Sequence, residues 1–473
     1  MPRRSSSRSP SAGGKQSASP LPSINTAVPA PANSPSLIPG VLVTFRRDAL
    51  KEVKNAAARF KNSLGIKNVA FASDFLAQAI DPEQTKSADM IIFDSLGVAV
   101  MDVDPDQAVS MSALSNDASI AAVEPEPIFF ALSDGAAPHF QAYLRGYKDA
   151  VDHLYEKMIG GLQPQGAELF PTIQGFQDTN DATWGLTATS VLNSRSTGRD
   201  VRVCILDTGL NLNHSDFRGR QIVSQSFIQG QTVDDDNGHG THCTGTACGP
   251  RSPTKGRRYG IAYEAEIYVG KVLSNQGSSL GRSTLAGIEW AVTNNCHIIS
   301  MSLGSRVQPG QPYLTAFEQL AREPLRRNTL IIAAAGNDSR RSQGNISPVG
   351  SPANCPSIMA VAAVDRFLRT ADFSNGAVNP DGRVDIAGPG VDIYSSSPDP
   401  AATPQPPYYR QWSAHNDTIS GTSQATPHAA GIAALLRQEN PTATADELWR
   451  MLTSQARALP QTSADVGSGL VQA

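Results

Sequence analysis

Residues 201–209, with the sequence VRVCILDTG, decide the fold of the larger part of this 473-residue chain. Residues 201–206 form a nearly continuous apolar run, which is typical of a parallel strand covered on both faces. The run places Asp207 at its carboxyl end, where ligands and chemistry gather in open α/β sheets. We therefore expect a buried strand that ends at a functional carboxylate.

Strand and helix patterns alternate along the rest of this part of the chain. Further strands are predicted at 267–273, 297–302, 330–336, 359–364 and 384–387, and helices at 283–294, 314–322, 425–436 and 444–452. The last helix begins with a capping box of Thr444 and Glu447. This alternation predicts an α/β fold with a doubly wound, mostly parallel sheet and helices on both faces.

Three short motifs, far apart in the chain, hold an acid, a base and a nucleophile. They are Asp207 in DTG (207–209), His239 in NGHGTH (237–242) and Ser423 in SGTSQATP (420–427). A serine hydroxyl is a poor nucleophile at neutral pH, so it needs an imidazole to accept its proton and a carboxylate to orient that imidazole. These three residue types therefore indicate acyl transfer through a serine.

Each motif has a simpler explanation when it is taken alone. Asp-Thr-Gly after a strand is usually a polar turn, and a serine at a helix start can be only a cap. His239 and His242 could bind a metal, although no Glu or Cys pair stands at zinc-ligand spacing. The order Asp, His, Ser differs from the chymotrypsin and α/β-hydrolase orders and favours the catalytic interpretation.

With these motifs in this order, roughly the last three fifths of the chain resembles the subtilisin-like serine peptidases, or subtilases, and looks closest to their proteinase K branch. The resemblance implies an acyl-enzyme on Ser423, with His239 as general base and acid and Asp207 orienting His239. It also implies that Asn337, after the small residues 333–336, donates to the oxyanion, a contribution of roughly 3–4 kcal/mol in a subtilisin. Taken alone, Asn337 would be a turn residue.

The same resemblance implies where a substrate binds. Ser302, Leu303 and Gly304, after the strand at 298–301, would pair their backbone with an extended peptide at a solvent-exposed strand edge. Ala334 and Gly336 would line the pocket for the residue before the cut bond. Affinity from main-chain bonds predicts broad specificity, although ordinary strand ends would explain both segments equally well without the three motifs.

The N-terminal part divides into three regions. Residues 1–38 are rich in Ser, Pro and Arg and are expected to be disordered. Residues 40–131 show a βαββαβ pattern, with helices at 48–64 and 105–114, and resemble the inhibitory propeptide of subtilases, although an unrelated accessory domain would fit too. Residues 132–180 form a linker with a helix at 139–158, and we expect self-cleavage within 124–182 and a peptidase domain over 181–473.

Composition sets the remaining limits. A net charge of −4 argues against a nucleic-acid binder, and no run approaches the roughly 20 apolar residues of a membrane span. The five cysteines form no dense disulfide framework, and Cys243, one helical turn after His239, is expected to pack beneath the imidazole, as in thiol-bearing subtilases near proteinase K. No cofactor is expected in catalysis. A structural calcium ion is possible, because the HSD segment at 214–216, with Asp216, resembles a calcium-binding segment of the family.

Three functions remain open on this sequence. The first is an endopeptidase made as a zymogen, acting on proteins or peptides as a monomer, with its own propeptide as inhibitor. The second is an acyl transferase or macrocyclase, in which an amine replaces water; no long insertion between His239 and Asn337 shields the acyl-enzyme. The third is a noncatalytic binding protein, which would be expected to lack a member of the acid, base and nucleophile set. The compartment is not indicated, because the family is mostly exported but no signal peptide is recognisable.

Overall fold

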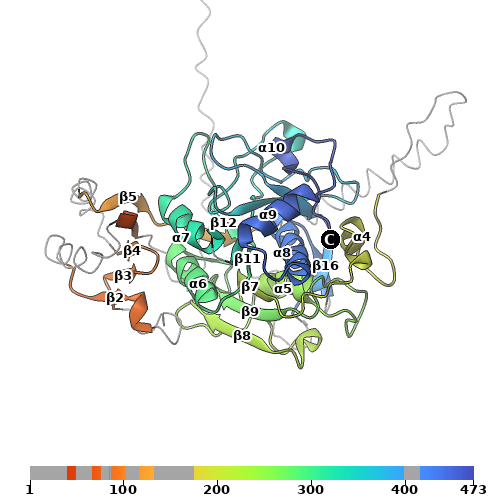
Figure 1. Cartoon of the computed structure of the whole chain (residues 1–473), viewed down its shortest axis with the longest axis horizontal. Helices are drawn as coiled ribbons and strands as arrows, with labels where there is room; N and C mark the ends of the chain where they lie inside the picture. The colour runs from red at the N-terminus through yellow and green to blue at the C-terminus, as the bar shows by residue number, and fades with distance from the viewer. Residues whose placement is uncertain are drawn as a thin grey trace, which may run out of the picture. The chain divides into compact units, whose positions relative to one another are not determined.

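The computed structural model describes residues 40–48, 66–75, 85, 87–102, 117–132, 175–326, 328–398 and 416–473 (Figure 1). The predicted tail at 1–38 and the predicted helices at 105–114 and 139–158 lie outside these residues, as does the helix at 48–64 apart from residue 48. None of the described helices is long and apolar enough to cross a membrane.

A seven-stranded sheet, in which every pair of neighbouring strands is parallel, organises the chain from residue 202 onward. Its order is β15-β14-β13-β11-β7-β9-β8. This confirms the predicted α/β fold. The strands, in sheet order, are Ile386–Pro389, Met359–Val364, Leu330–Ala334, Ile298–Met301, Arg202–Asp207, Glu266–Lys271 and Ile222–Ser226. Strand β8 has mixed polarity and was not predicted.

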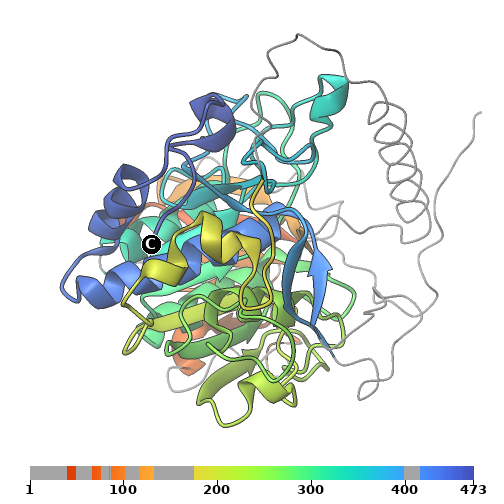
Figure 2. The same ribbon diagram turned by 90° about the vertical axis from the view of Figure 1, so that its right-hand side faces the viewer.

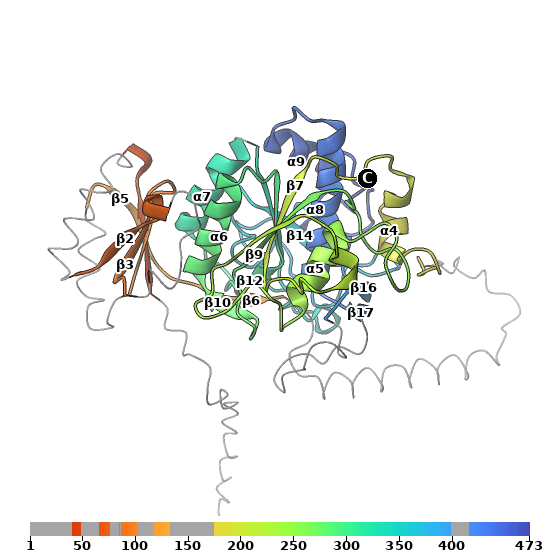
Figure 3. The same cartoon turned by 90° about the horizontal axis from the view of Figure 1, so that it is seen from below.

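Helices cover both faces of this sheet, as Figures 1 and 3 show. Alternate side chains of β7 enter two different apolar clusters, because successive residues of a strand point to opposite faces. Val203 and Ile205 pack with α5 (His239–Cys248) and α8 (Thr422–Glu439). Cys204 and Leu206 pack with α6 (Gly281–Thr293) and belong to the cluster that also contains α7 (Thr315–Arg326). The run at 201–206 is therefore apolar because both of its faces are buried.

Strand β7 lies where the winding of the sheet reverses. From β7 the chain builds β8 and β9 on one side and then crosses to β11, β13, β14 and β15 on the other. Loops diverge at such a point, so the carboxyl end of the strand opens into a crevice suited to binding. Asp207 is the last residue of β7 and stands at this crevice.

The long helix α8 runs through the interior of this region (Figure 2). Residues 422–437 of it are all buried. It begins at Thr422, three residues before the predicted start, because Gly421 serves as the N-cap in an extended backbone conformation. Helix α9 (Ala445–Ser454) has the predicted capping box, with mutual bonds between Thr444 and Glu447.

A second sheet, of five strands, is built by residues 41–125. Its order is β2-β3-β4-β1-β5, with β2 parallel to β3 and the other pairs antiparallel. The strands are β1 (Val41–Phe45), β2 (Val69–Phe71), β3 (Met90–Phe93), β4 (Val98–Met101) and β5 (Ile120–Pro125). All five coincide with strands that the sequence predicts, at 41–45, 68–72, 90–93, 98–103 and 120–123. The βαββαβ plan has four strands. The observed sheet has five, because β2 pairs with β3 as an additional edge strand.

A third sheet, of three strands, was not predicted. Strand β6 (Ile128–Ala131) lies between β10 (Ser278–Leu280) and β12 (Leu303–Gly304) and is antiparallel to both. The labels of these three strands lie close together in Figure 3. The sheet joins chain segments more than 140 residues apart, and no local pattern reports such pairing.

Several short elements complete the described fold and were also not predicted. They are α4 (Trp184–Ala188), α10 (Ser463–Val466) and the antiparallel hairpin of β16 (Ile393–Ser396) and β17 (Asn416–Ile419), together with short 3-10 turns at 72–75, 191–193, 215–217 and 341–343.

Candidate active site

Asp207 and His239 form a buried pair at the carboxyl edge of the seven-stranded sheet. Asp207 ends β7, and His239 is the first residue of α5, after Gly238, whose φ of 92° lets the chain turn sharply into the helix. The Asp207 Oδ1 atom lies 2.7 Å from His239 Nδ1 and also accepts a bond from the backbone amide of Thr208. The pairing holds the ring with Nε2 directed away from the carboxylate.

A network behind the pair ties the two segments together. Asp235 accepts bonds from the Thr208 hydroxyl at 2.8 Å, the Gly238 amide at 2.8 Å and the Thr241 amide at 2.8 Å. Lys271, buried at the end of β9, donates to the backbone oxygen of Thr208. These bonds join the strand that carries Asp207 to the helix that carries His239, so the two side chains are held before any ligand arrives.

The Asp207 carboxylate controls the protonation of His239. Burial by itself lowers the pKa of the imidazole, but the nearby Asp207 and then Cys243 outweigh it, and the pKa of His239 lies well above its ordinary value. A protonated His239 is thus stabilised in this site, as a general base requires once it has taken a proton.

Ser423 lies in the first turn of α8 and is completely buried. Its hydroxyl donates to the backbone oxygen of Ser302 at 2.9 Å, and His239 Nε2 has no hydrogen-bond partner among the described residues. The expected bond between serine and histidine is therefore not made. Catalytic bonds are often loose before a productive complex forms, and rotation of the serine side chain would redirect the hydroxyl.

Cys243 packs where the sequence placed it. Its Sγ lies 3.9 Å from His239 Nδ1 and donates to the backbone oxygen of Ser423 at 3.5 Å. Burial raises the pKa of this thiol, which therefore remains a small neutral side chain beneath the site. All five cysteines are free and buried, in agreement with the absence of a disulfide framework.

Asn337 directs its amide toward a carbonyl group of the chain itself. Its Oδ1 accepts bonds from the Thr422 amide at 3.0 Å and the Thr422 hydroxyl at 2.8 Å, which leaves Nδ2 free to donate elsewhere. Nδ2 donates to the backbone oxygen of Leu132 at 2.7 Å. The Leu132 carbonyl thus occupies the position between Asn337 and the start of α8.

Strand β6 leads to this carbonyl and pairs with another strand on each of its two edges. On one side, Leu303 pairs with Ala131 and Gly304 with Phe130, and Ser302 accepts a bond from the Leu132 amide at 3.2 Å. On the other side, β10 pairs with β6 over the three residues Ser278–Leu280. Residues 302–304, predicted to form a substrate edge open to solvent, are therefore paired with the chain itself, and their role in substrate binding stays a prediction.

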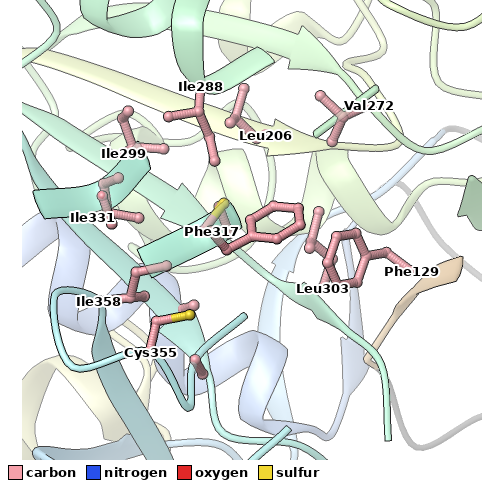
Figure 4. Close-up of a cluster of buried hydrophobic side chains, with 14 of the residues drawn as sticks. Phe129, Leu206, Val272, Ile288, Ile299, Leu303, Phe317, Ile331, Cys355 and Ile358 are labelled. Atoms are coloured by element: carbon pink, nitrogen blue, oxygen red, sulfur yellow. The ribbon is translucent and has the colours of Figure 1, made fainter. Parts of the chain in front are cut away.

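The side chains of β6 and of Leu132 after it differ in their burial and contacts. Phe129 is 0% exposed and packs edge-on against Phe317, with ring centroids 5.3 Å apart, beside Leu303 (Figure 4). Phe130 is 50% exposed. The side chain of Leu132 lies over Gly304, where an added Cβ would approach its Cδ1 to 2.9 Å.

Ala334 and Gly336 are less clearly connected to this peptide. Ala334 ends β13 and is buried. Gly336 contacts Asn375, and its amide donates to the Thr422 hydroxyl at 3.1 Å. Their predicted contact with the residue before the cut bond remains a prediction.

Asp216, the predicted calcium ligand, bonds to two groups of the chain, and its role as a calcium ligand stays a prediction. Its two carboxylate oxygens accept bonds from the Thr254 amide at 2.7 Å and the Tyr259 hydroxyl at 2.6 Å. Burial by itself would raise its pKa, but these bonds outweigh burial and lower it. Within the described ranges, the acidic, histidine and cysteine side chains close enough to share one ion are Asp207, His239 and Cys243. They are not the oxygen-rich set that calcium prefers.

The sequence patterns indicated neither strand β6 nor strand β10, nor the places of Gly421 and Gln424 beside the Leu132 carbonyl. Strands β6 and β10 pair with segments distant in the chain. Gly421 was read as part of a motif, and its closeness to the Leu132 oxygen appears only in three dimensions. The side chain of Gln424 was not considered, although its place next to Ser423 was a usable signal.

Comparison with known proteins agrees with this geometry. Residues 198–469 match the model of the subtilase family, peptidase S8. The chain is 34% identical over 275 residues to subtilisin DY of Bacillus licheniformis, covering 58% of this chain and 89% of that protein. It is 34% identical over 294 residues to subtilisin Savinase of Lederbergia lenta (61% and 96%) and 35% over 277 residues to subtilisin E of Bacillus subtilis (58% and 65%).

These relatives are subtilisins, so they do not support the expected closeness to the proteinase K branch. They support the wider assignment made from the order of the three motifs. The match spans more than half of the chain and includes Asp207, His239, Asn337 and Ser423. The chain belongs to the subtilase family of serine peptidases.

Proposed function

We propose that this subtilisin-like serine endopeptidase acts through an acyl-enzyme on Ser423 and is made as a zymogen with residues 40–131 as its inhibitor, in which residues 128–132 fill the cleft. One observation carries the proposal. The Leu132 carbonyl oxygen lies 2.7 Å from Asn337 Nδ2 and is reached by a strand paired on both edges. This is the pose of a peptide about to be cut after Leu132.

The proposed chemistry uses groups of the chain alone. His239 takes the proton of the Ser423 hydroxyl as that oxygen bonds to the carbonyl carbon, and Asp207 stabilises the imidazolium. Asn337 Nδ2 and the free amides at the start of α8 stabilise the oxyanion. The bond to the leaving amine then breaks, and the amine takes the proton from His239. Water, deprotonated by His239, releases the acid and restores Ser423.

The proposed specificity follows from how β6 is held. Main-chain pairing with β10 and β12 is indifferent to side chains, which supports broad specificity. Two side-chain contacts add a preference for particular substrate residues. Leu132 lies over Gly304, and Phe129 is buried against Phe317. We therefore expect substrates with a medium apolar residue before the cut bond and a large apolar residue three positions earlier.

The proposed inhibitor is anchored by carboxylates as well as by β6. Glu126, with a fully buried side chain, accepts bonds from the amide and guanidinium of Arg282 at the start of α6. Asp102 pairs with the same guanidinium. Glu124 accepts the amides of Thr315 and Ala316 at the start of α7. Carboxylates at helix N-termini are favoured by the unpaired amides and the helix dipole.

The cut that this pose supports is between Leu132 and Ser133, within the predicted interval 124–182. The test is expression of the wild-type chain beside Ser423→Ala, followed by intact mass and labelling with a serine-reactive phosphonate. We expect wild type to separate into residues 1–132 and 133–473 and to label, and Ser423→Ala to stay whole and unlabelled. Exposed Ser454→Ala on α9 is the matched control and should behave as wild type.

Other outcomes distinguish the alternatives. A wild-type chain that stays full length and unlabelled would overturn the peptidase mechanism at Ser423. Cleavage elsewhere with normal labelling would keep that mechanism and reject the pose of Leu132. Products joined to an added amine in preference to water would favour acyl transfer.

A further inference from the structure

We propose that Gln424 is a specificity residue of this enzyme, which recognises a polar group on the residue directly after the cut bond. The inference rests on the proposed function, because it assumes that Leu132 marks the residue before that bond. It concerns the leaving side of the substrate, about which the strand pairing of β6 says nothing.

The side chain of Gln424 has two buried polar atoms without a hydrogen-bond partner in the described structure, whereas every other residue with such an atom has one. Gln424 is 0% exposed, yet neither Oε1 nor Nε2 has a hydrogen-bond partner among the described residues. A buried amide without partners is costly, and native structures rarely keep one without a reason. Placed in helix α8 directly after Ser423, this amide is suited to receive a ligand group.

The amide lies next to the reacting carbonyl. A Cβ added to Gly421 would be 2.5 Å from the Leu132 oxygen, 2.8 Å from Gln424 Oε1 and 3.1 Å from Asn337 Nδ2. These three atoms therefore surround one point. Asn337 Nδ2 already donates to the Leu132 oxygen, and neither end of the Gln424 amide bonds to that oxygen in the described structure.

On the side of the cleft that holds the residues before the cut bond, the backbone groups pair with partners other than the Gln424 amide. Residues 128–131 pair with β10 and β12, and the Leu132 amide donates to Ser302. The Gln424 amide is therefore left to interact with the residue after the cut bond. A carboxamide offers an acceptor and two donors, so a hydroxyl there, which both donates and accepts, would satisfy it better than an alkyl group. In the sequence, the residue after Leu132 is Ser133.

The test compares two peptide substrates that differ only in the residue after the cut bond. Processed enzyme is given quenched peptides with Phe-Phe-Ala-Leu before the cut bond and Thr or Val, which have the same shape, after it. We expect kcat/KM to favour Thr roughly tenfold, since one buried polar group is satisfied or left unpaired. Gln424→Leu should reduce the preference to less than about twofold, because it keeps the side-chain size but removes the amide.

A substrate without a residue after the cut bond provides the internal control. The p-nitroanilide of Phe-Phe-Ala-Leu should discriminate little between wild type and Gln424→Leu compared with the peptide pair. Gln424→Glu, which keeps an acceptor, should retain part of the preference for Thr. Labelling by the phosphonate and thermal unfolding confirm that each variant has a folded site.

The outcomes separate this inference from the proposed function. Equal kcat/KM of wild type on the Thr and Val peptides would overturn the inference even if Gln424→Leu did not fold. An unchanged Thr preference in folded Gln424→Leu would overturn it too. Loss of labelling and of processing in the wild type would instead reject the proposed function.

Discussion

The carboxylates at the contact between residues 40–132 and 175–473 differ from the buried polar groups of the candidate active site. In the first region, Glu124 and Glu126 are fully engaged with amides and a guanidinium of the second. In the second region, His239 Nε2 and one oxygen of Asp207 lack partners within the described structure. Satisfied groups hold the two regions together, whereas unsatisfied groups are available for chemistry. The following variants test that difference.

The largest effect is expected at the buried acid of the second region. Asp207→Asn would present the wrong hydrogen-bonding group to His239 Nδ1, and we expect kcat to fall by about 10⁴ with loss of self-cleavage. Kinetics on a peptide p-nitroanilide check the first effect and intact mass the second. Asp216→Asn is the matched control, since that carboxylate bonds to Tyr259 and Thr254; it should lower the unfolding temperature rather than kcat. Retention of more than a tenth of kcat by Asp207→Asn would contradict the assigned role.

A smaller effect is expected at the oxyanion donor. Asn337→Leu removes Nδ2, which donates to the Leu132 oxygen, and should lower kcat by about 10²–10³ with little change in KM. Steady-state kinetics separate the two constants. Because Asn337 Oδ1 also accepts from Thr422, the phosphonate labelling and unfolding temperature must show that α8 keeps its start. A rise in KM alone would show that the amide only binds substrate.

The contact between the regions is expected to matter less for chemistry and more for release. Glu126→Gln removes the charge that faces Arg282, whose pKa is raised despite its burial by bonds to Glu126 and Asp102. We expect the processed parts to separate roughly 10–100 times faster, because a buried charge loses its partner. The lag before activity appears measures this. Asp102→Asn, 53% exposed, should shorten the lag only a few-fold at most.

The smallest effect is expected in the pH dependence of activity, whose acidic limb is shifted to higher pH. His239 acts as a base only when neutral, and its pKa is raised by Asp207 against the effect of burial. Activity should therefore rise with pH on a limb above the ordinary histidine value of about 6.5. The stabilising contribution of protonated His239 has the opposite sign: it is complete below the unfolded pKa and is lost as pH rises through the folded one. A kcat/KM profile with its acidic limb below pH 6 would contradict this pKa direction.

The main part of the fold was predictable because its signals are local. The apolar run at 201–206 predicted a strand covered on both faces, and β7 is that strand. All five strands of the N-terminal sheet were also recognised. Strands β6 and β10 were not, since they depend on partners distant in the chain.

The sequence predicted candidate site residues but not their contacts. The motifs predicted Asp207, His239, Asn337 and Ser423, and the structure places the first two in contact. Asn337 instead faces the Leu132 carbonyl, and the Ser423 hydroxyl faces Ser302 rather than His239. Asp216 accepts bonds from Tyr259 and Thr254, distant in sequence, and calcium binding by this residue stays a prediction.

The sequence by itself determined the family and the type of chemistry, because residue order and motif composition are properties of the chain alone. Only the tertiary structure decided which peptide lies in the cleft, which carbonyl faces Asn337 and which buried groups are left without partners. Those features depend on distances between atoms more than 100 residues apart, such as Leu132 and Asn337. Pairing across such separations follows from packing of the whole molecule, and no local pattern of side chains encodes it.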